Sequence, residues 1–219
     1  MIQRDIGCDR ILLRTGAVAA VAGVVTALVQ TAVDPSMPDD PVQAIRKASE
    51  SNLLPLSRLL DMAAFLLLLV AVAVITRALI AGPGAAWARI GLAFFTVSAG
   101  AGAIATMIVG SLADVGDAWA TAPAARQGGY VAAYDALDNI SGGIFAVSWS
   151  ALAVFALLYA VAIAKSRIFP RLLGWISVAS GLASITAVVA GVGLKGGGAF
   201  LFLLRLRWQR SGSHPARIP

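Results

Sequence analysis

Residues 90–113 read IGLAFFTVSAGAGAIATMIVGSLA and carry no charge between Arg89 and Asp114. A helix needs about 20 apolar residues to cross about 30 Å of hydrocarbon, so this run is long enough to span a membrane. The 219-residue chain as a whole is 59% hydrophobic and only 13% charged, whereas a soluble domain carries about 25% charged residues. The sequence therefore predicts an integral membrane protein.

The gaps between charges predict how many helices cross. Four uncharged runs reach membrane length, and a shorter one between Asp61 and Arg77 must draw flanking residues into the membrane. We predict an all-α polytopic transmembrane helix bundle forming a single domain, 1–219. Its five spans are expected at 15–33, 56–80, 90–112, 140–164 and 172–193, followed by a short sixth hydrophobic segment at 197–208.

The basic residues predict the orientation. With the N-terminus in the cytoplasm, eight Lys and Arg residues before the tail fall on the inner side and four on the outer side, as the positive-inside rule requires. A sixth segment would also bring the arginine-rich tail inside. The outer loops are then 34–55 and 114–130, and the expected location is the bacterial inner (plasma) membrane, with multiple passes.

The first outer loop contains a helical pattern, VQAIRKASESNLL, at 42–54. Asp39 or Asp40 can cap this helix, and Pro41 suits its first turn. We expect a short helix on the outer membrane surface. The functional alternative is a lid over a cavity.

The residue composition argues against metal binding, enzymatic activity and nucleic-acid binding. The chain has one cysteine, Cys8, and one histidine, His214, so we expect no metal site and no cofactor. The sequence contains no HExxH or GxSxG motif and no DxxxD-type diphosphate site, so we expect no enzymatic activity. The basic residues lie at helix ends without interleaved aromatics, so we expect no nucleic-acid partner.

Small residues recur every four positions in the third predicted span, at Ser98, Gly102, Thr106 and Gly110. Helices associate in membranes through close packing at small residues, because lipid tails are as apolar as leucine. We interpret these four residues as a helix-packing ladder. A hydroxyl-lined pore is the alternative.

One polar cluster could carry chemistry near the outer leaflet: Arg58, Asp61, Asp135, Asp138 and Asn139. Arg58 lies one helical turn from Asp61 and is its expected partner. If these residues lie in the lipid headgroup region, they form salt bridges where the helices enter the membrane. If they face each other across a cavity of the bundle, they form an ion or proton site.

Two functional hypotheses follow. The leading one is a structural or regulatory integral membrane protein that acts through helix contacts in the lipid bilayer, as a homo-oligomer or with a membrane-protein partner. The alternative is a small transporter or channel subunit with an outer-leaflet carboxylate site.

The stretch KSRIFPRLLGWISVASG, 165–181, resembles the loop and following helix of the DUF4386 family, through Pro170, Arg171, Leu173, Gly174 and Trp175. The first span, RTGAVAAVAGVV, is similar too, and the resemblance covers roughly 10–195. It implies an uncharacterised bacterial membrane protein with about six helices, and it carries over no catalytic residue. The chain departs from the family after Gly193, where the last segment is short and arginine-rich.

Overall fold

The computed structural model describes residues 3–35, 37–38, 40–166 and 169–190, with side chains from Arg10 to Thr186. This part of the chain folds into helices and contains no strand. The helices are α1 (Gln3–Val33), α2 (Pro41–Glu50), α3 (Leu54–Ile80), α4 (Ala85–Thr121), α5 (Ala124–Lys165) and α6 (Arg171–Ala190). The predicted all-α class is confirmed. The segment 197–208 lies outside the described residues.

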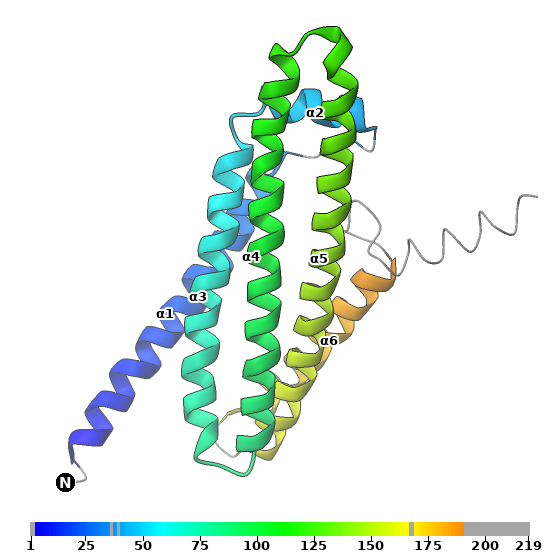
Figure 1. Cartoon of the computed structure of the whole chain (residues 1–219). Coiled ribbons are helices and arrows are strands. Elements are labelled where there is room, and N and C mark those ends of the chain that lie inside the picture. Colours follow the sequence, from blue (N-terminus) through cyan, green and yellow to red (C-terminus); the bar gives the residue numbers. More distant parts are fainter. Residues whose placement is uncertain (1–2, 36, 39, 167–168, 191–219) are drawn as a thin grey trace, which may run out of the picture.

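The long helices lie side by side in chain order. α1 packs on α3, α3 on α4, α4 on α5, and α5 on α6. Figure 1 shows α4 and α5 as a tall hairpin that rises beyond the end of α3, with α2 lying across this hairpin. We call this end of the molecule the α2 end. Short connections join the neighbouring pairs α3–α4 and α5–α6.

Four described helices are long and apolar enough to cross a membrane. Large apolar side chains on their surfaces face outward; Ile11, Val18 and Leu28 of α1, for example, are 69%, 68% and 65% exposed. Such surfaces suit a lipid environment. The four segments are Arg10–Val33, Leu54–Ile80, Ala85–Thr121 and Ala124–Lys165.

The prediction that 114–130 forms a loop is wrong. α4 continues to Thr121 and α5 begins at Ala124, so only two residues separate them. Charges mark where an apolar run ends, but they do not end a helix. The glycines in this segment each cost about 1 kcal/mol of helix propensity, which the alanine-rich surroundings tolerate, whereas Pro123 disfavours helical backbone in the residue before it.

α2 forms as the sequence predicts. Asp40 caps it by accepting a 2.8 Å hydrogen bond from the Gln43 backbone N–H, and Pro41 occupies the first turn. The buried side of α2, centred on Ile45, contacts α4 and α5. A Cβ at Gly116 of α4 would lie 2.9 Å from the Ser49 backbone nitrogen. The extended hairpin supplies an apolar protein surface that the expected loop would have lacked.

The opposite end is closed by tight backbone packing. A Cβ at Gly84, the N-cap residue of α4, would lie 2.5 Å from the carbonyl oxygen of Ala162 in α5. Nearby, Tyr159 of α5 passes over Gly91 of α4 and hydrogen-bonds Thr76 of α3. Three helices are therefore locked together at this end.

Candidate functional site: a polar cluster at the α2 end

The cluster joins the end of α1 to the beginning of α3. Arg58 Nη2 lies 2.5 Å from Asp34 Oδ1, forming an ion pair. Ser57 Oγ donates to the same carboxylate oxygen over 2.7 Å and accepts from Gln30 Nε2 over 3.2 Å. The Arg58 side chain is 14% exposed and that of Asp34 33%, so the pair is only partly accessible.

The structure corrects the expected partner of Arg58. The ion pair forms with Asp34 of the α1–α2 connection, not with Asp61. Helical side chains tilt toward the N-terminus of their helix, so Arg58 points away from Asp61 and toward the start of α3, where Asp34 lies. An arginine that precedes an acidic residue is the less favourable order for such a pair.

Asp61 instead faces α4. Its Oδ2 accepts a 2.6 Å hydrogen bond from Thr106 Oγ1. Asp61 also lies within electrostatic range of both Arg58 and Asp34. The charged groups therefore come from α3 and from the α1–α2 connection, and α4 contributes the neutral hydroxyl of Thr106.

The predicted residues of α5 divide between two faces. Asp138 is half-buried and lies one turn from the buried Tyr134, which is itself within electrostatic range of Arg58. Asp135 and Asn139 are exposed, and Asn139 Nδ2 donates to the Asp135 carbonyl oxygen over 2.7 Å. Residues four apart share a helix face, so the five predicted residues do not form one cluster.

The ladder residues of α4 lie against the same part of α3. Thr106 bonds Asp61, as described above. A Cβ at Gly102 would lie 2.5 Å from Phe65 Cζ, and one at Gly110 would lie 3.9 Å from Arg58 Cγ. The short side chains of α4 thus make room for three larger ones of α3.

Ser98 extends the ladder toward α5. Ser148 Oγ donates to the Ser98 carbonyl oxygen over 2.8 Å, and the two hydroxyl oxygens lie 3.3 Å apart. Both residues are buried. Along α4, the ladder therefore contacts helices on two sides.

Several residues of these networks were not predicted from the sequence. Asp34 ends the first uncharged run, and Arg58 lies three residues before Asp61, where the next begins, so their opposite charges near one membrane face were a usable signal. Ser57 and the buried link from Tyr159 to Thr76 offered none, since nothing in the sequence connects residues 83 positions apart.

The side chains of the cluster can form hydrogen bonds and ion pairs, but they do not form a metal site. Among the residues that the structure describes, no group of three or more His, Cys, Asp or Glu side chains could hold a metal ion. The Nε atom of Arg58 is buried and has no hydrogen-bond partner. The cluster can join helices, and Asp61 is a carboxylate within an apolar helix.

Together, apolar helices with outward-facing apolar side chains and a ladder of close helix contacts define an integral membrane protein. A family model described as "Domain of unknown function (DUF4386)" matches residues 15–206. The chain belongs to this family, as its sequence resemblance predicted. Neither the curated proteins nor the solved structures yielded a match.

The close packing at Gly102 leads to a prediction about the stability of the folded protein. Gly102→Ala places a methyl group against the Phe65 ring, whereas Gly100→Ala, on the same helix, meets no atom within 4 Å. Both changes gain helix propensity equally, so we expect Gly102→Ala to be about 1 to 3 kcal/mol less stable than Gly100→Ala. Thermal unfolding in detergent measures this. Equal melting temperatures would contradict close packing at Gly102.

Proposed function

We propose that this chain is a non-enzymatic, multi-pass protein of the bacterial plasma membrane with a structural or regulatory role. Its N-terminus is cytoplasmic, and five spans are followed by the short segment at 197–208. It acts by contacting lipids and either a second copy of itself or another membrane protein within the bilayer.

One observation supports this proposal most strongly. The polar groups of the cluster are used between helical elements: Asp34 with Arg58 and Ser57, and Asp61 with Thr106. Polar groups in apolar surroundings are stabilised by such partners. The cluster therefore serves to hold α1, α3 and α4 in one arrangement, as a structural role requires.

In-cell photo-crosslinking tests the leading proposal. A photoreactive residue at Val18 or Leu28, on the exposed side of α1, is expected to capture a second copy or another membrane protein. If neither position captures protein, and the purified chain is also monomeric in native membrane patches, the proposed role through protein contacts is wrong.

A small transporter or channel subunit is the second candidate, and Asp61 favours it. This carboxylate lies seven residues into α3 and accepts a hydrogen bond from a neutral hydroxyl, whereas the nearby Arg58 is paired with Asp34. An ionisable group within a membrane helix is a natural ion or proton site.

Flux measurements separate the two candidates. Under the leading proposal, proteoliposomes containing the wild-type chain show the same proton and cation flux as empty vesicles. Wild-type flux above that level, abolished by Asp61→Asn but retained in Asp135→Asn, would establish the transporter instead. Asp135 is the matched control because it is exposed on α5.

The orientation has its own test. In a Cys8→Ser background, single cysteines at the exposed positions Asn52 and Ala81 are compared with a membrane-impermeant thiol reagent in intact cells. We expect Asn52→Cys to react and Ala81→Cys to react only after the cells are opened. The reverse pattern would invert the proposed topology.

A further inference from the structure

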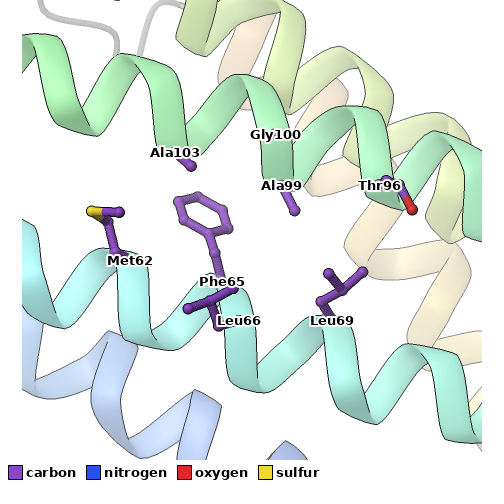
Figure 2. Close-up of a pocket in the computed structure, with 8 residues that line it drawn as sticks. All are labelled: Met62, Phe65, Leu66, Leu69, Thr96, Ala99, Gly100 and Ala103. Atoms are coloured by element: carbon purple, nitrogen blue, oxygen red, sulfur yellow. The ribbon is translucent and has the colours of Figure 1, made fainter.

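An apolar groove runs between α3 and α4, and its lining on α3 begins at Met62, the residue after Asp61. Its volume is about 230 Å³, and its walls are almost entirely apolar. Figure 2 shows Met62, Phe65 and Leu69 extending from α3 toward α4, which contributes short residues such as Gly100 and Ala103.

The one hydroxyl group in the lining, that of Thr96, already has a hydrogen-bond partner and does not require a polar ligand. Thr96 Oγ1 donates to the Leu92 carbonyl oxygen of its own helix over 3.0 Å. A Cβ at Gly100 would meet no atom within 4 Å, so the groove has its free space here. Hydrocarbon is the chemistry that this lining matches, because any polar ligand group would lose its hydrogen bonds on entering.

We propose that the groove binds one acyl chain of a membrane lipid from the leaflet at the α2 end. At a liquid-like volume of about 30 Å³ per small group, the space holds roughly eight methylenes. Acyl chains of this kind surround a protein in the bilayer, and the apolar lining matches their chemistry.

The depth of the groove in the membrane agrees with binding of an acyl chain from the leaflet at the α2 end. Met62 lies eight residues and Leu69 fifteen residues after Leu54, the first residue of α3. At 1.5 Å per residue, the groove extends from roughly 12 to 22 Å along the helix. α3 has 27 residues and is therefore about 40 Å long, which matches the thickness of a bilayer with its headgroup regions. The groove thus lies mostly on the α2 side of the midpoint of α3, at the depth where acyl chains end.

The edges of the groove disfavour a third helix. A helix of a second copy would need small residues on both walls for close backbone approach. The α3 wall instead presents Met62, Leu66 and Leu69, and Leu66 is 64% exposed. Ile104 of α4, 54% exposed, stands beside the other wall. A flexible chain fits between such side chains, whereas a helix is held away by them.

Native mass spectrometry of the full chain, extracted with its membrane lipids in mild detergent, tests the proposal. We expect the wild-type chain to retain one phospholipid, and Gly100→Leu to lose it because leucine fills the groove. Gly143→Leu is the matched control, since Gly143 of α5 also has no atom within 4 Å of its Cβ position but lies outside the groove. This control is expected to retain the lipid.

A second measurement shows where the acyl chain of the lipid binds. A phospholipid with a diazirine near its acyl terminus is expected to label peptides containing 62–69 and 96–103 in the wild type, and labelling should fall at least fivefold in Gly100→Leu and in Ala103→Leu. Unchanged labelling, or retention of lipid by folded Gly100→Leu, overturns the proposal. So does a wild-type dimer that Gly100→Leu separates, because a second copy would then occupy the groove.

Discussion

Arg58→Ala is expected to lower the free energy of unfolding by about 3 kcal/mol. Removing one partner of a largely buried ion pair costs about 3 to 5 kcal/mol, because the other charge is left without compensation. We expect the lower end of that range since Asp34, the partner, is 33% exposed. The measurement is the midpoint of thermal unfolding in detergent, combined with the unfolding enthalpy.

Two controls show whether the stranded charge is the cause. Arg77→Ala removes an exposed arginine from the other end of the same helix and should change stability by no more than about 0.5 kcal/mol. Adding Asp34→Asn to Arg58→Ala should recover part of the loss. If the double variant is less stable than Arg58→Ala alone, the uncompensated carboxylate is not the source of the effect.

Asp138→Asn should be milder than Arg58→Ala. Asparagine retains the size and much of the hydrogen-bonding capacity of aspartate, and Asp138 is only half-buried. If Asp138→Asn were the more damaging change, Asp138 rather than Asp34 would be the important carboxylate, and the transporter hypothesis would gain support.

Gly84→Ala is expected to have a similarly large effect, about 3 kcal/mol. The added Cβ would lie 2.5 Å from the Ala162 carbonyl oxygen and 3.1 Å from its carbonyl carbon. These are backbone atoms, so relief requires α4 and α5 to move apart. Overpacking of this kind costs about 1 to 3 kcal/mol, and we expect the upper end because no side chain can turn away.

Gly82→Ala provides the matched control in the same connection. Its Cβ would lie 3.7 Å from the Leu79 carbonyl oxygen, an ordinary contact. It should leave stability unchanged or slightly higher, since alanine restricts the unfolded chain. If the two variants unfold at the same temperature, the close approach of α4 to α5 at Gly84 does not exist in the folded protein.

The sequence predicted the features that depend on local composition. Uncharged runs of membrane length predicted apolar helices, and Asp40 with Pro41 predicted the start of α2. The four-residue repeat from Ser98 to Gly110 marked the face of α4 that lies against its neighbours. Each of these follows from the chain's own periodicity or capping chemistry, so no knowledge of distant residues was needed.

The sequence by itself thus determined a helical membrane protein and the small-residue face of α4. Only the tertiary structure decided that Arg58 pairs with Asp34 and that the α4–α5 hairpin receives α2. The physical reason is that both depend on which distant surface comes within a few ångströms. An arginine side chain reaches several carboxylates with similar ease, and helix packing selects one of them.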